Sequence, residues 1–131
     1  MKNFLFVCLA FILISCGSSK EVVVDLNGEY QLLEVQGEDL SDQDLSISFT
    51  PAENRISGET GCNGFSAKYT QENNVLSVGR AMSTRMYCEG KMDTEQKIIS
   101  SLEDVAKVKK DGKELVFYST DNQRLFTLTK K

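Results

Sequence analysis

The sequence predicts an α+β domain, in which a strongly curved antiparallel sheet or open barrel of about seven to eight strands packs around one helix. Three observations lead to this fold class. Short segments of alternating apolar and polar residues are separated by turns of about two to five residues, which is typical of antiparallel strands. One segment after residue 92 instead places its apolar residues at helical spacing. The 131 residues suffice for one domain.

Five strands are expected in the first half of the domain. They span residues 26–36, 45–50, 55–59, 65–70 and 75–78. The clearest is 45–50, because Leu45, Ile47 and Phe49 alternate with Ser and Thr. Residues 38–44 form an acidic loop, and 51–54 and 72–74 form turns. Two glycines around Cys62 and Asn63 predict a tight backbone feature at residues 61–64.

The second half is expected to hold the helix and three strands. Residues 79–90 are irregular and contain Cys88. The helix is expected at 93–104, because Ile98, Leu102 and Val105 recur at helical spacing. Asp93 followed by Gln96 resembles a capping box that would start this helix. Strands are then predicted at 105–109, 114–119 and 124–129, with a turn at 110–113 between the first two.

The composition excludes several classes of function. The chain contains no His, which rules out Ser-His-Asp and Cys-His catalysis and any His-ligated metal. The net charge of −4 argues against a nucleic-acid partner, because phosphates require a basic surface. We therefore expect a protein that is not an enzyme and has no cofactor and no resident metal.

Two weaker alternatives rest on acidic residues. A carboxylate pair drawn from Glu59, Glu89, Asp93 and Glu95 would suit a hydrolase that cleaves glycosides. Acidic residues are frequent in this chain, however, so such pairs arise by chance. Calcium binding by Asp39, Asp42 and Asp44 is the other alternative, although the spacing lacks the Gly and the final Glu of an EF-hand loop.

The N-terminus has the pattern of an export signal. Lys2 is followed by an unbroken apolar run from Phe4 to Ile14, which is typical of a secretory signal peptide. The run is shorter than the roughly 20 residues that span a bilayer. The mature chain should therefore lack this segment.

The end of the apolar run is more specific. Residues 13–17, Leu-Ile-Ser-Cys-Gly, resemble the bacterial lipobox. That resemblance implies cleavage before Cys16, whose acylated form becomes the mature N-terminus. We accordingly expect a signal peptide at 1–15, a lipidated tether at 16–24 and a domain at 25–131. The lipid anchor would be the membrane contact of a monomer in the cell envelope, at the outer membrane and facing the periplasm.

The remaining cysteines favour a disulfide. Cys8 would leave with the signal peptide and Cys16 would bear the lipid, so Cys62 and Cys88 remain. An even pair in an exported protein indicates a disulfide. A closed loop of about 26 residues would contribute about 3.5 kcal/mol to the free energy of unfolding. Two buried free thiols are the alternative.

Three motifs stand out in the centre of the chain. They are Gly-Cys-Asn-Gly-Phe-Ser at 61–66, Thr-Arg-Met and Cys at 84–86 and 88, and Met-Asp and Glu at 92–93 and 95. Together they resemble the META domain of the HslJ-like heat-shock lipoproteins. Tyr87 and Ala67 depart from the usual residues. The family implies an antiparallel sheet curled around a helix, an envelope location, and a role in stress response or envelope maintenance.

These observations predict a binding module. The disulfide would bring Asn63 near the loop that Arg80 and Arg85 flank, and the two guanidinium groups could take an anion or a carboxylate of an envelope protein or lipid. Alternatively, Asn63 caps backbone groups and both arginines are solvated or paired internally. A lipid-binding or secretion-pilot-like accessory lipoprotein is a further alternative, on analogy of fold.

A basic cluster flanks the turn near residue 112. It consists of Lys107, Lys109, Lys110 and Lys113. Such clusters usually keep a turn solvated and protect a sheet edge. A contact site for lipopolysaccharide or lipid head groups is the alternative.

Overall fold

The computed structural model describes residues 20–131. The expected signal peptide, Cys16 and the first part of the tether lie outside these residues. The elements are β1 (Gly28–Val35), β2 (Glu38–Asp39), β3 (Ser46–Thr50), the 3₁₀ turn η1 (Pro51–Glu53), β4 (Arg55–Glu59), β5 (Gly64–Glu72), β6 (Val75–Val78), β7 (Met82–Ser83), α1 (Met92–Asp104), β8 (Lys107–Asp111), β9 (Glu114–Tyr118) and β10 (Arg124–Lys130). Within this part of the chain, no helix is long and apolar enough to cross a membrane.

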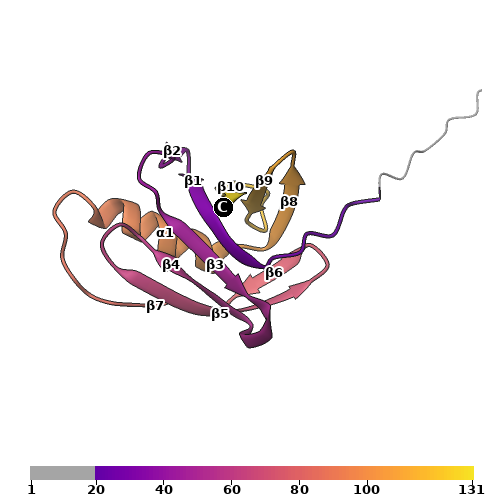
Figure 1. Ribbon diagram of the computed structural model, residues 1–131, viewed down its shortest axis with the longest axis horizontal. Coiled ribbons are helices and arrows are strands. Elements are labelled where there is room, and N and C mark those ends of the chain that lie inside the picture. Colours follow the sequence, from indigo (N-terminus) through magenta and orange to yellow (C-terminus); the bar gives the residue numbers. More distant parts are fainter. Residues whose placement is uncertain (1–19) are drawn as a thin grey trace, which may run out of the picture.

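The strands form one antiparallel sheet that closes on itself. The order is β10-β9-β8-β6-β5-β4-β3-β1-β2, and β10 also pairs with β1. The sheet therefore curls into a ring along one side of α1 (Figure 1). Residues 20–131 contain ten strands, two of which, β2 and β7, have only two residues. The predicted curved sheet around one helix is confirmed.

The ring has one thin junction. Strands β6 and β8 share a single register pair, Val75 with Lys107. Two backbone hydrogen bonds flank this pair, from the Leu76 N–H to the Ala106 carbonyl at 2.8 Å and from the Val108 N–H to the Asn74 carbonyl at 2.9 Å. This junction has fewer register pairs than any other pairing in the sheet.

Alternate residues of the strands fill the interior of the ring. Leu45, Ile47 and Phe49 are buried, as their alternation predicted. The ring of Phe117 lies between those of Phe49 and Phe126, with centroids 6.1 and 4.4 Å away. Side chains of this size occupy the inside of a small barrel completely, so the centre is a packed core.

The helix begins slightly earlier than expected and without the predicted cap. Lys91 is the N-cap residue and no side chain caps the helix, so the capping box from Asp93 to Gln96 is wrong. Asp93 is already inside the first turn, where its charge still favours the helix dipole. Ile98 and Leu102 are buried against the sheet, as predicted.

Several boundaries differ from the sequence prediction. The expected acidic loop at 38–44 contains β2, and the expected irregular segment at 79–90 contains β7. Strand β1 is shorter than the expected 26–36, and β5 is longer than the expected 65–70. Strand β8 begins at Lys107 because the buried Val105 ends the helix instead of starting the strand. The following turn is tighter than expected, since Gly112 adopts a φ of 59°, which glycine tolerates. In the acidic loop, Leu40 is buried, because an apolar side chain in a polar segment still packs into the core.

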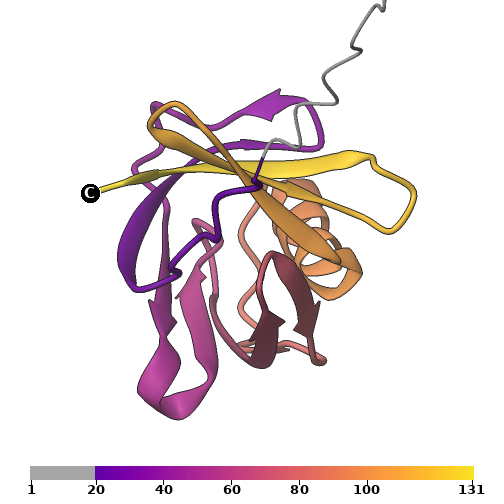
Figure 2. The same cartoon turned by 90° about the vertical axis from the view of Figure 1, so that its right-hand side faces the viewer.

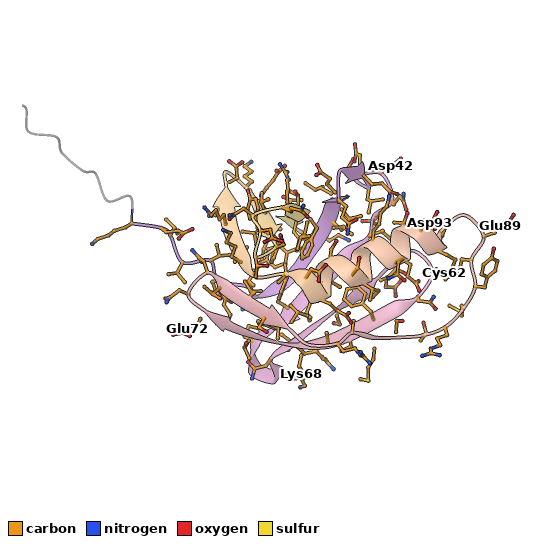
Figure 3. The ribbon with its side chains drawn as sticks, turned by 180° about the vertical axis from the view of Figure 1, so that it is seen from behind. Asp42, Cys62, Lys68, Glu72, Glu89 and Asp93 are labelled. Atoms are coloured by element: carbon orange, nitrogen blue, oxygen red, sulfur yellow. A yellow bond between two sulfur atoms is a disulfide. The ribbon has the colours of Figure 1, made fainter. Side chains whose placement is uncertain are left out.

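The molecule has two ends that differ in construction. We call residues 84–91, between β7 and α1, the distal loop. We call residues 22–25 together with the β8–β9 hairpin the tether end. Seen from behind, the N-terminal segment leaves at one end of the long axis, and Glu89 and Cys62 lie toward the other end (Figure 3).

Candidate functional site

The distal loop is irregular but firmly attached to the sheet. The disulfide between Cys62 and Cys88, with Cα atoms 5.8 Å apart, joins the loop to the turn between β4 and β5. This is the pair that the sequence predicted. Gly61 begins that turn with a φ of 86°, so a residue with a side chain would be strained there. The turn and the loop therefore form one unit.

Asn63 lies beneath this unit and is fully buried, with 0% exposed surface. Its side-chain oxygen accepts hydrogen bonds from the Thr84 hydroxyl and the Met86 N–H, both at 2.8 Å. Its amide nitrogen donates to the Met86 carbonyl at 3.0 Å and to the Glu95 carboxylate at 2.8 Å. The side chain thus uses both donors and both acceptor positions that an amide possesses.

Glu95 connects this arrangement to the helix. Its carboxylate also accepts a hydrogen bond from the Thr60 hydroxyl at 2.7 Å, and that hydroxyl accepts one from the Asn63 N–H at 3.0 Å. We call Thr60, Asn63, Thr84 and Glu95 the Asn63 cluster. It ties together the β4–β5 turn, the distal loop and α1. Three of its members, Asn63, Thr84 and Glu95, belong to the motifs singled out in the sequence, and here they have a structural role.

The sequence-predicted binding residues have different environments. Asn63 binds backbone groups of the loop, which is the alternative role considered for it, and it presents no polar atom to solvent. Arg80 and Arg85 are exposed, and neither forms an ion pair with another residue of the described chain. Arg85 lies between Thr84 and Met86, both bound by Asn63, so its backbone is fixed while its guanidinium group is free.

Sequence reasoning missed the exposed apolar side chains beside these arginines. Met82, Met86 and Tyr87 are 76%, 58% and 79% exposed. The sequence did contain a signal for this patch, because these large apolar residues stand in a segment without the strand or helix periodicity that would bury them. Tyr87 is also one of the departures from the family pattern.

The four acidic residues of the hydrolase alternative do not assemble into a pair. Glu59, Glu89 and Asp93 are exposed, and Figure 3 places Glu89 on the distal loop and Asp93 at the start of the helix. Glu95 is occupied by Thr60 and Asn63. A pocket of about 450 Å³ beside the start of α1 is lined by none of the four. This arrangement offers no acid and base facing each other.

Glu38 lines the pocket beside the start of α1 and binds two side chains of that helix. Its carboxylate accepts hydrogen bonds from the Lys97 ammonium at 2.7 Å and the Thr94 hydroxyl at 2.8 Å. These two bonds, the one from Lys97 being the stronger cause, lower the pKa of Glu38 below its ordinary value of 4.5. The ionised form therefore stabilises the contact between β2 and α1.

Two of the three aspartates of the calcium alternative have other partners. Asp39 accepts hydrogen bonds from the Ser41 hydroxyl and, as the smaller effect, from the Ser41 N–H, and both lower its pKa. Asp44 pairs with Lys131 at 3.1 Å. Among residues 20–131, no three His, Cys, Asp or Glu side chains converge in a way that could hold a metal ion.

Comparison with known proteins identifies a family for this chain. The profile of the META domain family matches residues 23–131. None of the curated proteins matches this chain in sequence.

Three solved structures are similar in fold. An NMR structure of a protein from Burkholderia xenovorans is 17% identical, with a TM-score of 0.63 over 81% of this chain and 83% of that one. A second NMR structure is 25% identical, with a TM-score of 0.61 over 79% and 89% of the two chains. The crystal structure of a DUF4847 family protein from Bacteroides vulgatus is 10% identical, with a TM-score of 0.57 over 79% and 92%.

Proposed function

Because the chain belongs to the META domain family, we propose that it is a membrane-anchored lipoprotein of the cell envelope whose domain binds a protein partner and catalyses no reaction. The partner contact would serve envelope maintenance under stress, the role that the family resemblance implies. Anchoring rests on the lipobox-like residues 13–17.

One observation carries the binding role: the distal loop is both exposed and fixed. Met86 and Tyr87 project apolar surface into solvent, while the disulfide and Asn63 hold the backbone beneath them. A loop that is already ordered loses little conformational entropy when it binds. The loop therefore has the properties of a preformed contact surface.

The composition of this surface favours a protein partner. Tyr, Met and Arg are enriched in protein interfaces, and Tyr and Arg are frequent among the residues that contribute most of the binding energy. Arg85 stands between Met86 and the β7 strand with its guanidinium group unpaired within the described chain. An interface with carboxylates around an apolar centre would complement it.

The position of the loop supports the same role. It lies at the end of the molecule opposite to the N-terminal segment (Figure 3). A chain anchored through Cys16 would present this loop away from its own membrane, where a protein in the same compartment can reach it.

A photocrosslinking experiment tests the binding role. A photoreactive amino acid is placed at Tyr87 of the full chain in growing cells, with Ser77, an exposed residue of β6, as the matched control position. We expect one discrete protein adduct from position 87 and none from position 77. Identical products from both positions, or no adduct from position 87, would overturn the proposal.

A second experiment tests the anchor alone. Cells are fed a fatty acid with an alkyne tag, and the protein is recovered from the membrane fraction. The natural chain should incorporate the label, and Cys16→Ser should lose both the label and the membrane association. Label that persists in Cys16→Ser would contradict acylation at this residue.

A further inference from the structure

The tether end contains a pocket that the proposed protein contact does not use. It has a volume of about 540 Å³ and lies between the N-terminal segment, residues 22–25, and the β8–β9 hairpin. Figure 2 shows the indigo N-terminal segment beside the orange hairpin. A pocket of this volume is in the range of small-molecule sites.

The wall of the pocket is held in place by hydrogen bonds. The Val24 N–H donates to the side-chain oxygen of Asn74 at 2.8 Å, and the Asn74 amide donates to the Val22 carbonyl at 2.9 Å. The Gln71 amide donates to the Val24 carbonyl at 2.6 Å. The last part of the expected tether is therefore docked on the domain, so the pocket has a defined shape.

The pocket has an apolar floor. Val24, Tyr30 and Leu115 line it and are buried in the surrounding protein. Val22 and Val23 also line it, and they are 68% and 57% exposed. Two exposed valines at the mouth continue the apolar surface outward, which is unfavourable in water unless something covers it.

The rim of the pocket is basic in a chain of net charge −4. Lys110, Lys113 and Lys130 line it, against a single acid, Asp25. Lys130 already contacts the Asn27 carbonyl and lies 4.9 Å from the centre of the Tyr30 ring. Lys110 and Lys113 are exposed and form no ion pair within residues 20–131, so two ammonium groups are available for an anion.

We propose that this pocket binds an anionic phospholipid. Lys110 and Lys113 contact the phosphate, and the start of an acyl chain lies on Val24 and Leu115. A lysine rim alone would suit any anion, but the apolar floor adds affinity only for an amphiphile.

The position of the pocket matches this ligand. Cys16 lies six positions before Val22, so the chain between them spans at most about 22 Å. A lipid anchor at Cys16 would hold the pocket close to the head groups of the same membrane, where anionic lipids attract lysine side chains. The chemistry of the pocket does not itself require the anchor.

The test uses residues 20–131, because every core residue of the described chain lies between Val24 and Leu128. NMR spectra are recorded while monomeric dihexanoyl phosphatidylglycerol is added, and separately with dihexanoyl phosphatidylcholine and with glycerol phosphate. We expect the phosphatidylglycerol to shift the signals of Val24 and Leu115 and to bind at least about tenfold more tightly than the other two.

Matched variants locate the site. The double variant Lys110→Gln with Lys113→Gln should weaken phosphatidylglycerol binding by about tenfold or more. Lys68→Gln with Lys91→Gln removes the same charge from two exposed residues that do not line the pocket, and it should leave the affinity unchanged. Equal weakening by both doubles would reveal only general attraction between charges and would overturn the proposal.

The remaining outcomes also decide the question. Equal affinity for glycerol phosphate would identify a simple anion contact, and equal affinity for phosphatidylcholine would identify a non-specific apolar one. If the full acylated chain in phosphatidylcholine vesicles already shows the shifts of Val24 and Leu115, its own acyl chain fills the pocket. Each result overturns phospholipid binding without bearing on the partner of the distal loop, which the crosslinking experiment tests separately.

Discussion

The two ends of the molecule are each held together by a buried asparagine, but the two side chains make different numbers of hydrogen bonds. At the distal end, the side chain of Asn63 makes four hydrogen bonds to the loop and the helix, one of them to a carboxylate, and a disulfide lies beside it. At the tether end, the side chain of Asn74 makes two, and its carbonyl supports the thin junction between β6 and β8. The distal end is thus held much more strongly.

This difference explains what each end offers to a ligand. At the distal end, buried hydrogen bonds of Asn63 hold the backbone of the loop, while the side chains of Met86 and Tyr87 are exposed to solvent. At the tether end, a few bonds hold the N-terminal segment across a gap, and the apolar side chains face a pocket. The loop at the distal end is fixed by many hydrogen bonds, so it can contact a protein without losing much conformational entropy. The tether end has fewer hydrogen bonds and contains a pocket that a small molecule can enter.

The largest loss of stability is expected when the disulfide at the distal end is removed. The double variant Cys62→Ser with Cys88→Ser should lose about 3.5 kcal/mol of unfolding free energy, because the unfolded chain is no longer cross-linked. Denaturant unfolding under oxidising conditions measures the loss. A reductant should lower the natural chain to the same stability and leave the variant unchanged. A natural chain that is insensitive to reductant would contradict the prediction.

The second-largest effect is expected when the side-chain amide of Asn63, beneath the distal loop, is removed. Asn63→Ala should cost about 3 kcal/mol, because Met86 and Glu95 lose partners in a buried setting. Asn63→Asp keeps the shape but places an oxygen against the Glu95 carboxylate, so it should destabilise the protein at least as much at pH 7. Thermal unfolding compares the two variants. If Asn63→Asp retained natural stability, the amide donor would not be essential.

A smaller effect is expected at the tether end. Asn74→Ala should cost about 1.5 kcal/mol, because it removes two hydrogen bonds, one buried and one partly buried. It should also speed hydrogen exchange at Val24, whose N–H then lacks its acceptor. Gln71→Ala, which removes bonds from the same segment but none from the Val24 N–H, is the control. A loss as large as that of Asn63→Ala would remove the contrast between the two ends.

The smallest effect concerns a partly exposed carboxylate. Glu38→Gln should cost about 0.5 kcal/mol at pH 7, as is typical of such pairs. Since the folded-state pKa of Glu38 is lowered, its contribution is complete above about pH 4.5 and falls as the pH drops through that lowered pKa. Thermal midpoints of both chains between pH 7 and 3 should therefore converge. A gap that widens on acidification would contradict this sign.

Much of the fold could be predicted because its signals are local. The alternation around Ile47 and the helical spacing around Ile98 describe single elements, and the pairing of Cys62 with Cys88 follows from a count of cysteines. The capping box at Asp93 failed because the chain enters the helix at Lys91, held by contacts outside the motif. The binding role considered for Asn63 depended on exposure, which a pattern of residue types does not reveal.

The sequence by itself determined the longer strands, the helix, the expected export signal and the cysteine pair, because each follows from neighbouring residues or from composition. It did not predict the two-residue strands β2 and β7. Only the tertiary structure decided that β10 closes the ring on β1, that Glu95 meets Asn63, and that Val24 and Leu115 share a pocket with Lys110 and Lys113. These contacts join residues that are far apart in the chain. Their geometry depends on how the whole sheet curves, so no local pattern specifies it.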